Sequence, residues 1–337
     1  MARTTSSEQE PVRRRTVREL AVREIRRISA GFGHSVGPLL EVGQDGQVLV
    51  FVSVPDGSEF QCWDVRTGEL AWRDGEGVSD CNDTALVRLP DGGLSLAAAT
   101  EDGVEWWDAF TGRHRPERAW EETTVWALSA GQLGGRPVLL GAGNDGSVYG
   151  WDGNSGAALE PPRFEAGAGS SAMAVAYVPL PSEEGVIVAG DDAGRLWRWD
   201  PVTGDLLGEP TAGPASKVRI IKALPPAVGT SLFVSSDQEG ILQRWDTETG
   251  APVGPAMETG TYVFALATAG VDGTDLLLAA GADEVVRAWD AGTGEPIGLA
   301  VQGVAVSIPA RGSGATLLAT STARGEIVVY ECGIRSA

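Results

Sequence analysis

Ser35 and His34 lie in the stretch Gly33-His34-Ser35-Val36-Gly37, which fits the pattern G-x-S-x-G. In serine esterases this pattern places a nucleophilic serine on a tight turn between a strand and a helix, and a base histidine follows later in the chain. Here the following segment, PLLEVGQDGQVLVFV, predicts strand, turn and strand, and the other of the two histidines, His114, lies in the unrelated stretch HRPERAW. The pattern therefore favours a structural role for His34 and Ser35 over catalysis.

Two further patterns suggest cofactors but lack the context that those cofactors require. GAGNDG (141–146) fits the dinucleotide fingerprint G-x-G-x-x-G, which needs a helix after it, whereas SVYGWD predicts a strand and hence a hairpin. CWDVRTGELAW (62–72) resembles the tryptophan-docking motif of quinone-dependent dehydrogenase propellers, but it occurs clearly only once, with Trp72. No His/Cys cluster and no D-x-D-x-D-G calcium loop occurs in the sequence. We therefore expect no cofactor, no metal and no enzymatic activity.

Charge is distributed unevenly along the 337 residues, whose formal net charge is −20. Residues 1–27 carry eight arginines and four glutamates, so the remainder is close to −24. A body this acidic repels phosphate backbones, which argues against nucleic acid and for a basic partner.

Cysteine usage and hydropathy indicate where the protein resides. Cys62, Cys81 and Cys332 form no disulfide framework, which fits free thiols in a reducing cytoplasm. No stretch is apolar enough for a signal peptide or a membrane span, so no membrane partner is expected. The preference for Arg, Ala and Gly, with only two lysines, suggests a bacterial, GC-rich genome of the actinobacterial kind.

An internal repeat determines the predicted fold. Of the 11 tryptophans, six precede aspartate, in stretches such as VEWWDAFTG, LWRWDPVTG and VRAWDAGTG, and a seventh copy reads IVVYECG. The repeat anchors, spaced 41 to 48 residues apart, are Trp63, Trp107, Trp151, Trp199, Trp245, Trp289 and Tyr330. An apolar residue lies three positions before each anchor: Phe60, Val104, Val148, Leu196, Leu242, Val286 and Ile327.

Each repeat also contains short apolar runs that predict buried strands. Those directly before the anchors are 48–54, 94–100, 138–143, 186–190, 231–236, 276–281 and 316–322. Further upstream lie runs such as 125–130, 172–178 and 262–268, and a weaker strand follows each anchor. Four strands per repeat result.

Four-stranded units of this length, each with Trp-Asp ending its third strand, resemble the WD-repeat β-propeller family over about residues 23–332. The resemblance implies an all-β, seven-bladed propeller of antiparallel blades. It also implies that an N-terminal strand, residues 23–30, completes the last blade beside Ile327–Glu331 and removes the open edges. The expected domains are a basic, largely disordered tail (1–22) and the propeller (23–333).

The same resemblance assigns His34 a partner network. In the family, a Gly-His histidine bonds to a turn aspartate, a Ser or Thr of the second strand and the Trp of the third. Here the matching residues are Asp56, Ser53 and Trp63, and the other six repeats have no Gly-His. Tryptophan packing and aspartate turns must hold those repeats instead.

Carboxylates recur in the predicted hairpin turns between second and third strands. The candidate interaction face comprises Asp102, Asp145, Asp191, Asp192, Asp237, Glu239, Asp283 and Glu284, with Arg324 in the seventh repeat. One interpretation is ordinary turn chemistry, since Asp-Gly favours hairpins. The other is an acidic ring that attracts a basic protein or peptide.

The expected function is a cytoplasmic, non-enzymatic scaffold for a protein partner. The alternative is a propeller that binds a small ligand or acts as a hydrolase, lyase or quinone-type enzyme through acidic residues at the channel mouth. Residues 1–15 are either a solvated leader or a docking arm, and Val17, Leu20, Ala21 and Ile25 could form a short amphipathic helix.

Overall fold

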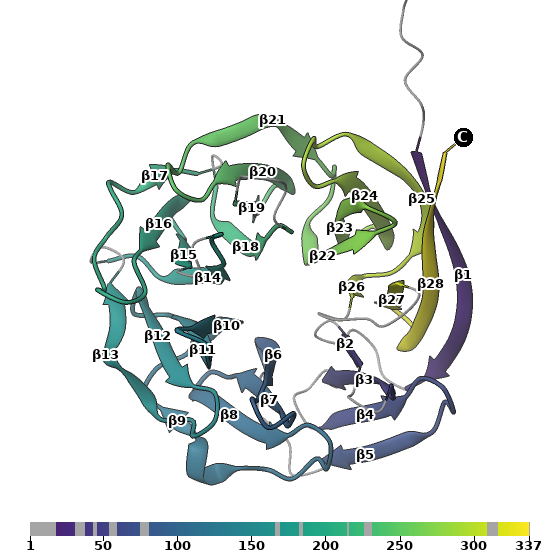
Figure 1. Cartoon of the computed structure of the whole chain (residues 1–337), viewed down its shortest axis with the longest axis horizontal. Helices are drawn as coiled ribbons and strands as arrows, with labels where there is room; N and C mark the ends of the chain where they lie inside the picture. The colour runs from purple at the N-terminus through teal and green to yellow at the C-terminus, as the bar shows by residue number, and fades with distance from the viewer. Residues whose placement is uncertain are drawn as a thin grey trace, which may run out of the picture.

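The computed structural model describes residues 18–30, 38–42, 46–53, 59–74, 81–165, 169–181, 185–213, 216–225, 231–308 and 316–336. In these residues the fold is all-β, and 28 strands form six sheets. The only helix in this part of the chain is a 3-10 turn at Pro116–Arg118. Figure 1 shows the sheets arranged around a central axis. The strands follow one another in sets of four along the chain, and the first strand of each set is innermost.

Five sheets are four-stranded and antiparallel, with strands in sequence order. They are β2 (Leu39–Val42), β3 (Val48–Ser53), β4 (Phe60–Asp64) and β5 (Leu70–Asp74); β6 (Asp83–Arg88), β7 (Leu94–Ala99), β8 (Gly103–Asp108) and β9 (Trp120–Glu121); β10 (Val125–Leu133), β11 (Arg136–Gly143), β12 (Ser147–Asp152) and β13 (Ala158–Glu165); β14 (Ala172–Val178), β15 (Val186–Asp191), β16 (Arg195–Trp199) and β17 (Thr211–Ala212); and β18 (Val218–Ala223), β19 (Leu232–Asp237), β20 (Ile241–Asp246) and β21 (Pro252–Glu258).

The sixth sheet has eight strands in the order β22-β23-β24-β25-β1-β28-β27-β26. These are β22 (Val263–Val271), β23 (Thr274–Gly281), β24 (Val285–Asp290), β25 (Pro296–Gln302), β1 (Arg18–Ser29), β28 (Glu326–Ser336), β27 (Thr316–Ser321) and β26 (Ala305–Ser307). Two sets of four strands meet where β1 pairs in parallel with β25, at Glu19 opposite Gly298. The N-terminal strand thus joins the two sets into one sheet.

The second strands of the sets form the core, as their apolar runs predict. Every residue of β7, β15 and β19 is buried, and β11 is buried except at its first residue. The apolar residues three positions before the anchors, from Phe60 to Ile327, are all buried as well. Each sheet therefore buries both faces against its neighbours around the ring.

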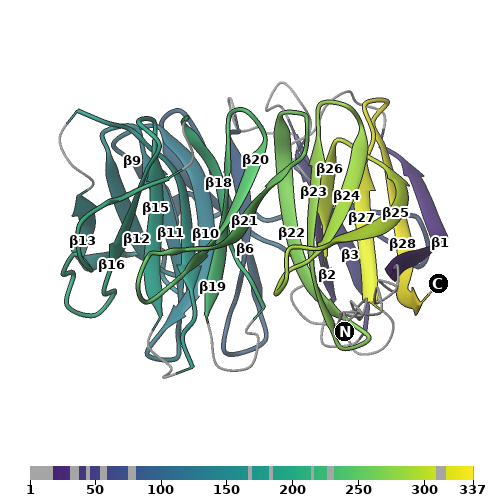
Figure 2. The same cartoon turned by 90° about the horizontal axis from the view of Figure 1, so that it is seen from above.

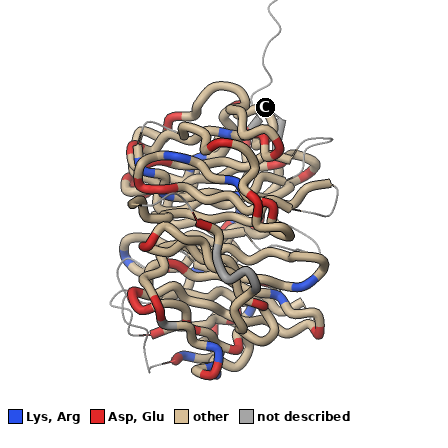
Figure 3. Tube along the Cα trace, turned by 90° about the vertical axis from the view of Figure 1, so that its left-hand side faces the viewer, with Lys and Arg blue, Asp and Glu red and all other residues tan. Residues whose placement is uncertain are grey.

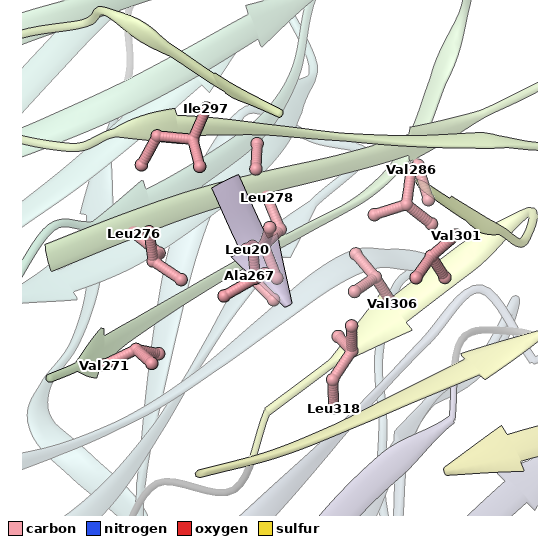
Figure 4. Close-up of a cluster of buried hydrophobic side chains, with 12 residues drawn as sticks. Leu20, Ala267, Val271, Leu276, Leu278, Val286, Ile297, Val301, Val306 and Leu318 are labelled. Atoms are coloured by element: carbon pink, nitrogen blue, oxygen red, sulfur yellow. The ribbon is translucent and has the colours of Figure 1, made fainter. Parts of the chain in front are cut away.

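The N-terminal strand pairs with β28 as the sequence indicates, but it begins earlier than the expected boundary at residue 23. Arg23 lies opposite Glu331 and Ile28 opposite Ile327, and the pairing continues to Arg18 opposite Ser336. Residues 18–22 are therefore strand, not part of a disordered tail and not the amphipathic helix considered for this segment. The reason is burial: Leu20 is 2% exposed and packs into a cluster with residues of β22 and β23 (Figure 4).

Candidate functional site

Turns lie at the two ends of the ring, because the strands run between its two faces (Figure 2). We call the end with the turns between second and third strands (residues 100–102, 144–146, 192–194, 238–240, 282–284 and 322–325) the hairpin face. The segments that enter the first strands share this face, since the Ser171 hydroxyl bonds to the Asn144 carbonyl (2.9 Å) and the Val125 amide to the Thr100 carbonyl (3.0 Å). We call the opposite end, with the Trp-Asp turns, the motif face.

The Trp-Asp turns of the motif face are structural. In the turn after β12, Asp152 Oδ1 accepts hydrogen bonds from the Ser155 amide and hydroxyl, both at 2.9 Å. Gly156 then adopts a φ of +74°, which glycine reaches without strain. The same arrangement recurs at Asp108 with Thr111 and Gly112. The Asp, the Thr or Ser and the Gly of the repeat thus build one tight turn.

The electrostatics of these turn aspartates agree with that role. At Asp108 burial raises the pKa, but hydrogen bonds from Thr111 and Arg115 outweigh it, so the pKa is lowered overall. Asp152 is lowered in pKa for the same reason: bonds from Ser155 and Asn154 outweigh burial. Both groups are therefore stabilised as carboxylates by their own turns.

Five of the six tryptophan anchors are buried: Trp107, Trp151, Trp199, Trp245 and Trp289. Trp63 and Tyr330 are only partly buried. The indole nitrogens of the tryptophan anchors bond to different partners. Trp245 Nε1 donates to the Ser235 hydroxyl (2.9 Å), and Trp63 Nε1 donates to Gln61 Oε1 (3.0 Å). Ser53 is buried at the end of β3, but His34 and Asp56 lie outside the described residues, so the His34 network stays a prediction.

Arginines and one tryptophan connect neighbouring sheets at the motif face, a feature that the sequence analysis did not identify. The Arg198 guanidinium donates to the Thr247 and Glu248 carbonyls (3.1 and 2.7 Å) of the next sheet's turn, and Arg244 donates to the Thr293 carbonyl (2.9 Å). Trp72 Nε1 donates to the Ala109 carbonyl (2.9 Å) of the next sheet, a structural contact. The available signal was the arginine directly before Trp-Asp in two repeats, at Arg198 and Arg244, and a tryptophan after the turn in one, at Trp72.

Of the residues that suggested catalysis or nucleotide binding, the structure describes His114 and residues 141–146. His114 stacks on Trp107 (ring centroids 4.9 Å apart), and its Nε2 lies 2.9 Å from Glu105 Oε2. Ser35 lies outside the described residues. Residues 141–146 are the end of β11 and its hairpin turn, followed by β12 and not by a helix, so the fingerprint context is absent there.

The acidic candidates of the hairpin face divide into two groups. Asp102, Asp145, Asp192, Glu239, Asp283 and Glu284 are exposed, as is Arg324. Asp191 and Asp237 are 0% and 2% exposed, which corrects their assignment to an interaction face. Asp191 accepts bonds from Arg195 Nε (2.7 Å) and Trp197 Nε1 (3.0 Å), and Asp237 accepts one from the Ile241 amide (2.8 Å).

Two of the exposed carboxylates are engaged within their own sheets. Asp145 Oδ2 accepts a hydrogen bond from the Tyr149 hydroxyl (2.6 Å), and Asp283 Oδ2 pairs with Arg287 (2.5 Å). Among these candidates, Asp102, Asp192, Glu239 and Glu284 thus remain exposed without such an engagement in the described part of the chain. Acidic positions also cover the side of the ring (Figure 3), so the negative field is not confined to one face.

A pair of perturbed carboxylates at the axis would have favoured enzymatic activity. The carboxylates of raised pKa among the described residues are Asp83 and Asp275, which lie in different strands, β6 and β23. Burial raises the pKa of Asp83, while the Lys222 charge and the amides of Leu128 and Thr84 lower it in part. Asp83 Oδ2 accepts the Leu128 amide (2.8 Å) and so joins neighbouring inner strands.

Within the described residues, no group of three or more His, Cys, Asp or Glu side chains is placed to hold a metal ion. In the same part of the chain no helix has the length and apolarity needed to cross a bilayer.

No protein-family model matches the sequence, and no curated protein matches it. In three dimensions the chain is similar to the crystal structure of the computationally designed Ika8 protein, with a TM-score of 0.57 and 19% sequence identity. The similarity covers 91% of this chain and 99% of that chain. At this identity the likeness concerns the fold alone, and it agrees with a β-propeller-like arrangement of repeated sheets.

Proposed function

We propose that the chain is a seven-bladed propeller of the WD-repeat type, and that it acts as a non-enzymatic platform for a basic protein partner. The seven blades are the five four-stranded sheets and the two sets of four strands that β1 joins in the eight-stranded sheet. The six Trp-Asp turns support the family assignment, since each aspartate organises a turn of the same form.

The observation that carries the function is the set of exposed, unengaged carboxylates on the hairpin face, in a chain of net charge −20. Like charges at the turns of neighbouring sheets add to one another's field, which speeds encounter with a basic surface and makes binding sensitive to salt. A bacterial cytoplasmic location is proposed from the composition.

The test compares two triple variants that remove the same number of charges from opposite faces. Asp102→Asn, Asp192→Asn and Glu239→Gln neutralise the hairpin face, and Glu69→Gln, Asp205→Asn and Glu248→Gln neutralise exposed residues at the motif face. Each tagged protein is used for affinity capture from the native host at low and high salt, and bound proteins are quantified by mass spectrometry.

We expect a basic protein captured at low salt to fall at least tenfold with the hairpin-face variant and to be unchanged with the motif-face variant. Equal capture by all three proteins would contradict the proposal. Retention of a small molecule in place of a protein partner would favour the ligand-binding alternative.

A further inference from the structure

Four neighbouring inner strands carry a β-bulge at the same position beside the hairpin face. The register shifts lie between Val125 and Ala127, Ala172 and Ala174, Val218 and Ile220, and Val263 and Ala265. The extra residues are Trp126, Met173, Arg219 and Phe264. Strands β10, β14, β18 and β22 are successive around the axis (Figure 1). A bulge redirects a side chain. Here Phe264 is exposed and Trp126 and Arg219 are half-buried, whereas Met173 is buried.

Strand β18 and the residue before it concentrate positive charge in this acidic protein. Both lysines of the chain, Lys217 and Lys222, lie here, with Arg219 between them. Lys222 is close enough to Asp83 of β6 to lower the pKa of that buried carboxyl in part. Within the described residues, Lys217 and Arg219 form no ion pair, so their charges remain available to a partner.

Two aromatic rings, Phe264 of β22 and Tyr262 directly before that strand, extend this cationic site. The Arg219 guanidinium carbon lies 5.7 Å from the Tyr262 ring centroid, and the Tyr262 and Phe264 rings lie 5.3 Å apart. Phe264 is 52% exposed. The exposed Phe264 ring, with Tyr262 and Arg219 beside it, therefore offers a partner an apolar contact next to a cation.

The backbone around these side chains is tightly fixed. The Gln238 amide donates to the Lys217 carbonyl (3.1 Å), and the Ala282 amide donates to the Tyr262 carbonyl (3.0 Å). A Cβ atom on Gly240 would lie 1.9 Å from the Thr261 carbonyl oxygen, so the hairpin turn between β19 and β20 packs directly against the segment that enters β22. Arg219 and the two rings therefore form one site on a fixed backbone, and Lys217 lies two residues before Arg219 in the same segment.

We propose that Lys217, Arg219, Tyr262 and Phe264 form a docking site for an extended segment of the protein partner that presents a carboxylate beside an apolar side chain. The carboxylate pairs with the two cations, and the apolar group packs on the exposed ring of Phe264. The inference rests on the proposed function and refines it: the surrounding acidic face attracts basic parts of the partner, and this site selects one acidic, apolar stretch.

The test uses a phage-displayed library of random linear peptides as the probe. Wild-type protein is compared with Lys217→Gln/Arg219→Gln, with Phe264→Ala, and with Arg66→Gln/Arg113→Gln, which removes two exposed cations from the motif face. We expect wild type and the motif-face control to enrich peptides with Asp or Glu within two positions of Phe, Leu, Ile or Met. That enrichment should fall at least tenfold in the other two proteins, whose melting temperatures should match wild type.

Enriched peptides are then synthesised, and their dissociation constants are measured by fluorescence anisotropy beside analogues with Gln or Asn in place of the acidic residues. Equal binding of the neutral analogues, equal binding by Lys217→Gln/Arg219→Gln, or failure to enrich any acidic, apolar peptide would overturn the inference. Enrichment of purely basic peptides would also overturn it while supporting the acidic face. The capture experiment with the hairpin-face carboxylates tests the proposed function separately.

Discussion

A single tryptophan anchor stabilises its repeat by packing, by hydrogen bonding, or by both. Trp151 is 1% exposed, and its Nε1 has no hydrogen-bond partner in the described part of the chain. We expect Trp151→Ala to lower the free energy of unfolding by about 3–5 kcal/mol, because a large cavity replaces the indole. Trp151→Phe should cost less than Trp245→Phe, since the latter leaves the buried Ser235 hydroxyl without its indole donor. Urea denaturation measures all three, and equal losses for the two Phe variants would refute the distinction.

Single residues also show which features of the structure could be predicted from the sequence. The burial of five of the seven anchors and of the apolar residues from Phe60 to Ile327 could be predicted, because spacing and hydrophobicity agree. The orientation of the turn carboxylates could not: Asp191 is buried and its neighbour Asp192 is exposed, although both belong to the same Asp-rich turn. One residue of register at the strand end decides between a structural and an exposed carboxylate.

At the scale of the element, the Trp-Asp turn depends on an ionised aspartate. The pKa of Asp152 is lowered in the folded state, because hydrogen bonds from Ser155 and Asn154 outweigh the burial that raises it. The stabilisation is thus complete above the unfolded pKa of about 4 and is lost as the pH falls below it. Asp152→Ala should destabilise by about 1 kcal/mol or more at pH 7. The deficit of Asp152→Asn should shrink at pH 3, and thermal melts at both pH values would show it. A constant deficit would contradict the charge argument.

The bulges of the inner strands are a feature of the elements that could not be predicted from the sequence. Strand runs such as 125–130 were predicted, but no bulge was predicted in them. The buried residues at the strand starts are instead three apart, as in Val125 and Leu128 or Val263 and Leu266. The three-residue spacing is visible in the sequence, but it occurs both in a bulged strand and in a turn of helix. The bulge is therefore identified only by the register of the pairing between β10 and β11.

The whole molecule depends on one strand contributed by the N-terminus. β1 pairs with both β28 and β25, and Leu20 fills the core cluster between them. Beyond the ring, the Ile334 amide of β28 donates to Asp272 Oδ2 (2.9 Å), which ties the extended β1–β28 ribbon to the β22–β23 turn. Removal of β1 would expose the edges of two strands, and unpaired edges recruit other chains.

We therefore expect deletion of residues 1–29 to lower the melting temperature markedly and to yield oligomers. Deletion of residues 1–17 should leave the oligomeric state and the melting temperature unchanged. Light scattering coupled to size-exclusion chromatography and differential scanning calorimetry measure both properties. Leu20→Asp in the full chain is a third variant, which keeps the strand but places a charge in the buried cluster, and it should also destabilise the ring. If the 1–29 deletion kept the oligomeric state and the melting temperature of the full chain, the closing role of β1 would be refuted. If the 1–17 deletion changed the oligomeric state, residues 1–17 would be acting as a docking arm.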